Sequence, residues 1–310
     1  MNYGALVFLA AFFALASSWY GFVLMPQIQV GRDPQTKITG TSDLYPQARS
    51  GLARQGLEVY RANGCVSCHS QQVGQTATAC EVELTDAGTN QAATVAMLAK
   101  LSPDFANTEL QQLLANLPKT ILRLPSLDAS DAAVKSLQTV GAKAQSRITP
   151  QGPDIARGWG RRRTVAEDYL YDNPVQLGSQ RIGPDLANAG SRLPDAHWHL
   201  LHLLNPQLLV KGSTMPPYKF LFEERKLEPG RQPSPDAIPL TAAGVLFDAS
   251  KATGPVDREI VPRPEAKALV AYLLSLRADA PLFNAPLTPP APANTVPPPE
   301  NEPAASASAK

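Results

Sequence analysis

The sequence predicts a mainly α-helical protein with a single N-terminal transmembrane helix, a helical domain that carries a helical insertion, and a disordered proline-rich tail. Three observations lead to this prediction. The first 30 residues contain no charged side chain, two amphipathic stretches frame residues 47–280, and many of the 30 prolines lie near the C-terminus. Apolar residues make up 44% of the 310-residue chain, enough for a packed core. The net charge of +1 gives no reason to expect a nucleic acid partner.

The uncharged N-terminal stretch has the length of a membrane span. As an α-helix, Ala5–Met25 would extend roughly 31 Å, which matches the hydrocarbon core of a bilayer. Trp19 and Tyr20 suit the interfacial aromatic belt at its end. The alternative is a cleaved signal peptide with Ala14-Leu15-Ala16 at its cleavage site. Because no Lys or Arg precedes the apolar run, and the run continues well past that site, we expect an uncleaved anchor over residues 1–30.

Two amphipathic helices are expected in the main domain, which spans residues 47–280 and follows a linker over residues 31–46. The first helix comes directly before a cysteine motif and has one apolar face: Leu52, Gly56, Val59 and Tyr60. The glycine in this face permits close approach of another backbone. The second helix begins at Pro264. Its apolar residues also share one face: Leu269, Tyr272, Leu273 and Leu276.

Residues 75–157 are interpreted as an inserted helical subdomain. They are rich in Ala, Leu, Thr and Gln, and the segments "NTELQQLLANLPKTILRL" and "DASDAAVKSLQTVGAKA" look helical. The insertion contains Cys80 and Met97 but no His, so the sequence indicates no chemistry there. Farther along, "DAHWHLLHLLNP" predicts a short helix that ends at Pro206. Residues 281–310 are rich in Pro, Ala and Ser and are expected to be disordered.

The motif Cys65-Val-Ser-Cys68-His69 carries the chemistry of the chain. Two thiols at this spacing can add across the two vinyl groups of one haem, and the adjacent imidazole then lies under the iron. A zinc site would use Cys80 as a third thiolate and His69 as the fourth ligand, but neighbouring residues rarely both reach one small ion. A redox disulfide would need a strand before the motif and a βαβ pattern around it, and neither is visible. The motif therefore predicts one covalently bound haem c.

A six-coordinate haem iron needs a second axial ligand, and Met215 in "KGSTMPPYKF" is the best candidate. The two prolines behind it stiffen a loop that can hold a thioether at the iron. The alternatives are three histidines: His197, His199 and His202. Methionine opposite histidine raises the reduction potential, and a fully ligated iron has no open position. The predicted haem therefore moves electrons and does not bind oxygen.

The segment "RIGPDL" is a candidate for orienting the motif histidine. A Gly-Pro turn can present the carbonyl oxygen of Pro184 to the Nδ1–H of His69 and so fix the imidazole ring. The alternative is an ordinary turn. The arginine run at residues 161–163 suits haem propionates, an acidic partner or a solvated loop. Cys80 is left over once haem takes the other two thiols, and it is interpreted as an inert thiol or as one half of an intermolecular disulfide.

With its motifs taken in order, the chain resembles the monohaem subunit II of cbb3-type cytochrome c oxidases. The matching segments are "VYRANGCVSCHSQ", "YLYDNPVQLGSQRIGPDL", "WHLLHLLNP", "GSTMPPYKFL" and "EAKALVAYLLSL". The Ser-Gln after the haem motif, the Gly-Pro-Asp-Leu turn and the Trp-His-x-x-His-Leu pattern are not general to cytochromes c. The resemblance implies a transmembrane helix followed by a cytochrome c-like helical haem domain. The sequence departs from the family in the insertion, in the loop from Glu223 to Val261 and in the extra tail.

The resemblance also implies residue roles, a location and partners. The implied roles are haem vinyl attachment by Cys65 and Cys68, axial ligation by His69 and Met215, orientation of the histidine by Pro184, and packing near the haem by Trp198. The implied location is the bacterial inner membrane. The haem domain is expected on its periplasmic face, because haem is attached covalently outside the cytoplasm. The implied partners are a haem-copper catalytic subunit, a dihaem cytochrome c subunit or soluble donor cytochrome, and the lipid bilayer.

The function implied by this family is electron transfer. The subunit would take electrons from a donor cytochrome and relay them to the haem b of the catalytic subunit, where oxygen is reduced in aerobic respiration. Other readings of the chain are the small subunit of a nitric oxide reductase, a free membrane-anchored shuttle, a haem-based gas sensor and a zinc-bound assembly factor. A sensor needs a vacant or labile axial position, so Met215 discriminates that reading from the relay.

Overall fold

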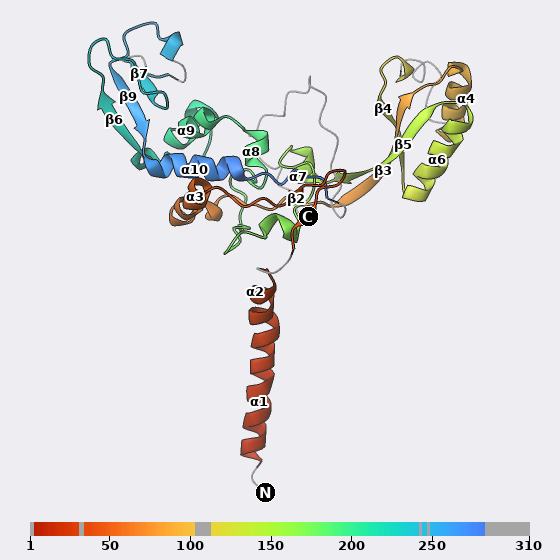
Figure 1. Cartoon of the computed structure of the whole chain (residues 1–310), viewed down its shortest axis with the longest axis horizontal. Coiled ribbons are helices and arrows are strands. Elements are labelled where there is room, and N and C mark those ends of the chain that lie inside the picture. Colours follow the sequence, from red (N-terminus) through yellow and green to blue (C-terminus); the bar gives the residue numbers. More distant parts are fainter. Residues whose placement is uncertain (1–2, 31–33, 103–112, 242–243, 247–248, 283–310) are drawn as a thin grey trace, which may run out of the picture.

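The chain has a mixed α and β fold. The computed structural model describes residues 3–30, 34–102, 113–241, 244–246 and 249–282. About 41% of the described residues lie in helices and 18% in strands, and the strands form three sheets. The expected mainly α-helical class is therefore wrong. A long N-terminal helix stands below a central helical unit, which has a small sheet at one end and a projecting α/β unit at the other (Figure 1).

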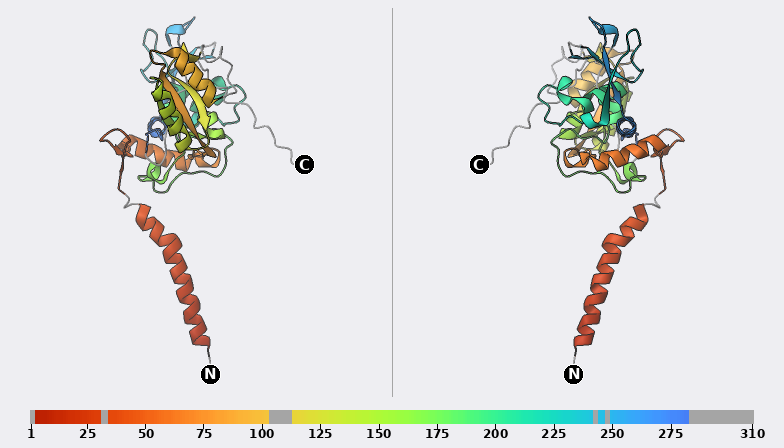
Figure 2. Two further views of the ribbon diagram at one scale, coloured as in Figure 1. Left: turned by 90° about the vertical axis from the view of Figure 1, so that its right-hand side faces the viewer. Right: turned by 90° about the vertical axis from the view of Figure 1, so that its left-hand side faces the viewer.

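The N-terminal apolar stretch forms one continuous helix. Its parts are α1 (Gly4–Trp19), the π-helical turn η1 (Tyr20–Leu24) and α2 (Met25–Val30). Within Gly4–Gln29 the most apolar 18-residue window has a mean hydropathy of 1.9 and no buried residue. Two side views show this helix standing clear of the body of the molecule (Figure 2). An apolar helix of this length without protein cover is a candidate membrane span.

The central unit is organised by the crossing of α3 (Gly51–Ala62) and α10 (Pro264–Ser275). A Cβ atom on Gly56 would overlap the carbonyl oxygen of Ala268 and lie 2.7 Å from Cβ of Tyr272. The two backbones are therefore in contact at a point where only glycine fits. Beside this contact the rings of Tyr60 and Tyr272 pack with their centroids 5.3 Å apart. The close approach that the sequence predicts at Gly56 is confirmed.

The buried face of α10 agrees with the prediction, whereas that of α3 is rotated. In α10, Leu269, Tyr272 and Leu273 are buried. In α3, Leu52 is 47% exposed, and the buried residues are Ala53, Gly56, Leu57 and Tyr60. The backbone contact at Gly56 explains the rotation, because it turns Ala53, Leu57 and Tyr60 toward α10.

Further short helices complete the central unit. They are η2 (Cys65–Ser67), α7 (Pro153–Ala156), η3 (Ala166–Tyr169), α8 (Ala189–Arg192), α9 (Ala196–Leu204), η4 (Pro206–Leu208) and η5 (Lys219–Leu221). Helix α9 ends before Pro206, as predicted. The apolar cluster that these elements share with α3 and α10 is called the central core here. Its larger members are Leu57, Tyr60, Leu200, Leu201, Leu203, Leu204, Leu221, Phe222, Ile238, Leu269, Tyr272, Leu273 and Leu276.

Two of the three sheets flank the central unit. The strands β6 (Phe222–Lys226), β7 (Ile238–Thr241), β8 (Gly244–Val245) and β9 (Arg258–Pro262) form an antiparallel sheet in the order β6-β9-β7-β8. This sheet, with η6 (Ala249–Lys251), occupies the region in which the sequence departs from its implied family, and it leads directly into α10. In the linker, β1 (Thr36–Lys37) pairs with β2 (Leu44–Tyr45).

The insertion is an α/β unit, and the expectation of a helical subdomain is wrong. Its antiparallel sheet has the order β4-β3-β5, from β3 (Ala77–Asp86), β4 (Lys119–Leu124) and β5 (Lys143–Gln151). Helix α6 (Leu127–Thr139) packs on all three strands and α4 (Gln91–Leu101) packs on α6. The unit has its own core, separate from the central one: Val82, Leu84, Leu98, Ile121, Leu122, Ala133, Leu137 and Ala142.

The prediction for the insertion fails at its short apolar runs, which form strands where helices were expected. The segment predicted to be helical up to residue 124 is a strand from Lys119, and its residues 107–112 lie outside the described residues. The second predicted helix is confirmed as α6, but the chain becomes strand β5 at Lys143. A run such as "KTILRL" fits either a buried strand or a helix by its apolar pattern alone. Pairing with β3 decides in favour of the strand.

A buried ion pair ties the linker and the C-terminal segment to the centre. Arg162 is fully buried and donates two hydrogen bonds to Asp168, of 2.7 and 3.0 Å, and one to the carbonyl oxygen of Ala280. The hydroxyl of Tyr45 donates to the same carboxylate at 2.6 Å. Arg162 is therefore neither part of a solvated loop nor directed to an external anion. Breaking such a buried pair from one side typically costs about 3–5 kcal/mol.

The Gly56 contact yields a stability prediction. Gly56→Ala should lower the free energy of unfolding by about 1–3 kcal/mol, the usual cost of overpacking, because the new methyl group meets the backbone of Ala268. Thermal unfolding of the detergent-solubilised chain measures the change. The control Gly51→Ala lies on the same helix with nothing within 4 Å of the added atom, and should change stability by about 0.5 kcal/mol or less. Equal effects of the two variants would contradict the packing argument.

Candidate functional site

The cysteine motif sits on a tight turn at the end of α3. The turn η2 is closed by the amides of Cys68 and His69, which both donate to the carbonyl oxygen of Cys65, at 3.2 and 3.0 Å. Cys65 is half-buried and packs against the central core together with Val66. Burial raises the pKa of the Cys65 thiol to about 11. Reactive and redox-active thiols have lowered pKa values, so this environment does not suit a redox disulfide.

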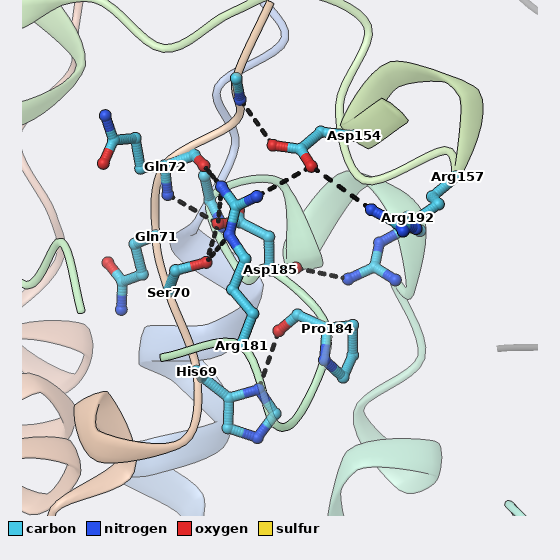
Figure 3. A network of polar contacts seen from close by, with 12 residues as sticks. His69, Ser70, Gln71, Gln72, Asp154, Arg157, Arg181, Pro184, Asp185 and Arg192 are labelled. Atoms are coloured by element: carbon cyan, nitrogen blue, oxygen red, sulfur yellow. Dashed lines mark hydrogen bonds and ion pairs between the residues drawn. The ribbon is translucent and has the colours of Figure 1, made fainter. Parts of the chain in front are cut away.

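The imidazole of His69 is held by the loop that contains Pro184. Its Nδ1 lies 2.8 Å from the carbonyl oxygen of Pro184 (Figure 3). A carbonyl oxygen can only accept, so Nδ1 carries the proton and the lone pair is on Nε2, the nitrogen suited to bind a metal. A Cβ atom on Gly183 would overlap the ring at Cε1 and lie 2.7 Å from Nδ1. The backbone of this loop therefore lies directly against the ring.

The residues after His69 are locked to the same loop by a buried carboxylate. Asp185 has no exposed surface. It accepts hydrogen bonds from the Ser70 hydroxyl at 2.5 Å, from the Gln72 amide at 2.7 Å and from the Ala187 amide at 2.8 Å. Backbone bonds from Gly183 to Cys68 and from Leu186 to Ser70 run alongside. The Gly-Pro-Asp-Leu turn thus fixes the position of the motif as well as the orientation of its histidine.

Gln71 connects the motif to the helix crossing. Its buried side chain exchanges hydrogen bonds with the hydroxyl of Tyr272 on α10, at 3.0 and 3.1 Å. Its carbonyl oxygen accepts from the Tyr169 hydroxyl at 2.6 Å, and its amide donates to Leu177. The Ser-Gln pair, which the sequence marks only as a family pattern, therefore anchors the motif to two other parts of the chain.

Helix α9 presents three aromatic rings near the motif. Trp198 stacks on His202 with centroids 4.7 Å apart and an interplanar angle of 10°, and meets His199 edge-on at 5.3 Å. His199 is buried, and its Nε2 lies 2.8 Å from the carbonyl oxygen of Leu193. Burial, together with electrostatic repulsion from the neighbouring His199 and His69, lowers the pKa of His202 to about 4. The Nδ1 atom of His202 is buried without a hydrogen-bond partner in the described part of the chain.

Met215 approaches the central core from the loop after η4. Its side chain is half-buried and packs against the same cluster as Cys65. Its amide donates to the Ser213 hydroxyl at 3.3 Å, and the amide of Tyr218 donates to Leu203 of α9 at 2.8 Å. The loop is thus attached to α9. The structure brings Met215 and Cys65, 150 positions apart in the sequence, to the same apolar cluster.

These residues fit a haem attached by two thioether bonds. The motif thiols lie on one turn beside an apolar cluster, and the histidine tautomer is fixed with its lone pair on Nε2. Helix α9, which packs in the same cluster, carries the orphaned ring nitrogen of His202. They do not fit the zinc alternative, because Cys80 is on β3 of the inserted unit. Among the described residues, no group of three or more His, Cys, Asp or Glu side chains is placed to hold a metal ion.

The structure thus places the Cys-x-x-Cys-His turn, with its oriented histidine, beside an apolar core in a chain with a long apolar N-terminal helix. Comparison with protein families is more specific, since residues 145–233 match the family described as cytochrome c oxidase, mono-heme subunit/FixO. This match confirms the resemblance to the monohaem subunit of cbb3-type oxidases, and it supports a cytochrome c oxidase subunit. With the N-terminal apolar helix it indicates a membrane-anchored protein. No curated protein matches the chain.

The matched region contains Pro184, Trp198 and Met215, while the Cys-x-x-Cys-His turn lies before it. Sequence reasoning missed the residues that hold the turn in place. Asp185 was quoted only as part of its motif, and Asp154 gave no signal because its partners are about eighty residues away along the chain or lie in another loop.

The buried His199 predicts a pH dependence of stability. Burial lowers its pKa below the ordinary 6.5, against the opposing effect of its bond to Leu193. As pH falls below about 6.5, the His199 imidazole becomes protonated in the unfolded chain but stays neutral in the folded chain. The free energy of unfolding therefore decreases. His199→Gln removes this group, and its destabilisation relative to wild type should be smaller at pH 5 than at pH 7.

Thermal unfolding at both pH values measures this difference. A His199→Gln effect that is independent of pH would contradict the prediction.

Proposed function

We propose that this chain is a membrane-anchored c-type cytochrome that relays electrons to the catalytic subunit of a cbb3-type terminal oxidase. The hydrogen bond between His69 and Pro184 carries the proposal, because it prepares the motif histidine as a metal ligand. The family match over residues 145–233 supports the oxidase context.

Six residues would hold one haem c. Cys65 and Cys68 would attach it, His69 and Met215 would be its axial ligands, Pro184 would keep the proton on Nδ1 of the histidine, and Trp198 would pack near it. When bound, the haem supplies reversible one-electron transfer at its iron. The central core would exclude water from one side, and Gly183 would keep the imidazole plane fixed.

The N-terminal helix would anchor the cytochrome in the bacterial inner membrane with its body on the periplasmic face. An anchored relay needs only short movements between donor and acceptor, since tethering raises the effective concentration of a partner in the same membrane. The proposed acceptor is the haem-copper catalytic subunit. The proposed donor is a dihaem cytochrome c subunit or a soluble cytochrome. No oxygen chemistry is assigned to this chain, because both axial positions of the iron would be filled.

The haem proposal predicts different outcomes for the three cysteines. Cys65→Ala and Cys68→Ala should each break one thioether bond, and the double variant should lose covalent haem altogether. Cys80→Ala is the matched control, because that thiol lies in the inserted unit, and it should retain full haem content. Haem staining after denaturing electrophoresis and the intact mass of each variant measure the result. Undiminished covalent haem in the double variant would refute the attachment site.

The relay proposal is tested by purifying the complex. The chain, tagged at its C-terminus, is extracted from native membranes in mild detergent and assayed for oxygen consumption with reduced cytochrome. A relay should bring along a large multi-helix subunit with high-spin haem and copper, and the activity should be cyanide-sensitive. Elution alone, as a low-spin cytochrome without activity, would favour a free anchored shuttle and overturn the oxidase assignment.

A further inference from the structure

A buried aspartate links the inserted unit to the cysteine motif. Asp154 lies on α7, directly after strand β5, and is only 2% exposed. One carboxylate oxygen accepts a hydrogen bond of 2.7 Å from the amide of Gly74, five residues after His69. The other oxygen accepts one of 2.9 Å from the guanidinium of Arg181. The last helix of the insertion thus contacts the segment that follows the motif and the loop that contains Pro184.

The guanidinium group of Arg181 has several partners, and its side chain is 37% exposed. Besides Asp154, it donates to the Ser70 hydroxyl at 2.9 Å and to the carbonyl oxygen of Gln72. It also lies over the ring of Trp159, 5.4 Å from its centroid. Arg157, from the end of the insertion, lies 5.1 Å from the same ring and 3.8 Å from Asp154. The fork of Arg181 is therefore locked in one orientation.

These contacts form a continuous chain to the axial histidine. Asp154 binds Arg181, Arg181 donates to Ser70, and Ser70 donates to Asp185, which is next to Pro184 (Figure 3). Both carboxylates are almost completely buried, so solvent ions screen them poorly. A charge in this position acts on the histidine and on its Pro184 loop more strongly than a surface charge would.

We propose that Asp154 and Arg181 are positioning residues that set the reduction potential of the haem, with Asp154 contributed by the inserted unit. The inference rests on the proposed function, since it concerns the iron that His69 would bind. The insertion is thereby part of the electron-transfer site and is not a separate appendage.

The proposal predicts shifts of opposite sign. Asp154→Asn removes a buried negative charge, while Arg181 keeps its pairing with Asp185 at 4.0 Å. The more positive surroundings favour the reduced iron, so the potential rises. Arg181→Gln removes a positive charge, while Asp154 keeps Arg157 at 3.8 Å, and the more negative surroundings lower the potential. The double variant removes both charges and should return close to the wild-type value. Each single substitution should change the equilibrium constant for electron exchange by up to about tenfold. For a one-electron couple this corresponds to a shift of about 59 mV in reduction potential.

The experiment is a spectroscopic redox titration of the purified full-length chain and its variants. Covalent haem is measured first by absorbance and mass, so that failure of the proposed function, no haem in the wild type, is distinct from failure of this inference. Arg181→Lys is the conservative variant, which keeps the charge and should keep most of the wild-type potential. Asp86→Asn is the matched control, because Asp86 pairs with Lys143 at the far end of the insertion, and it should not shift the potential.

A purely structural tether predicts a different pattern. It would give Asp154→Asn and Arg181→Gln potentials that are unchanged or shifted in the same direction, and Arg181→Lys would behave like Arg181→Gln. Either pattern, in variants that retain covalent haem, overturns the proposal. Opposite shifts with restoration in the double variant support it.

Discussion

The backbone contact between Gly56 and Ala268 is the constraint on which the rest of the central unit depends. It fixes how α3 lies against α10, and the Cys-x-x-Cys-His turn begins three residues after α3 ends at Ala62. The same contact brings α10 beside the motif, so that Tyr272 reaches the buried side chain of Gln71. The packing of α3 on α10 thus determines the position of Gln71, two residues after the histidine. The histidine itself is then oriented by Pro184.

The helical part of the molecule could be predicted from sequence because its signals are local. An apolar face, a proline at the first position and a glycine within a helix face indicated α3, α10 and the crossing between them. The spacing of the two thiols and the histidine indicated the site chemistry in the same way. Pro184 was within reach of such reasoning, because a proline carbonyl in a turn is a common partner of a ligating imidazole.

The parts that could not be predicted depend on pairing between distant segments. "KTILRL" became a strand because β3 lies beside it, and no property of those six residues settles that choice. The sequence leaves Arg162 open to haem propionates, an acidic partner or a solvated loop. Its burial depends on Asp168 and Ala280, which meet it in space. Asp154 was overlooked for the same reason.

The two strands that connect the insertion to the centre have a consequence for folding order. Ala77 and Gln151 are direct partners across β3 and β5, and the inserted unit has a core of its own. Once that unit has formed, the chain on either side of it emerges from neighbouring positions. The two halves of the site, distant in sequence, are then joined by a short effective loop, and bringing them together costs little closure entropy. Despite the length of the insertion, the residues on its two sides then meet as if they were close together in the sequence.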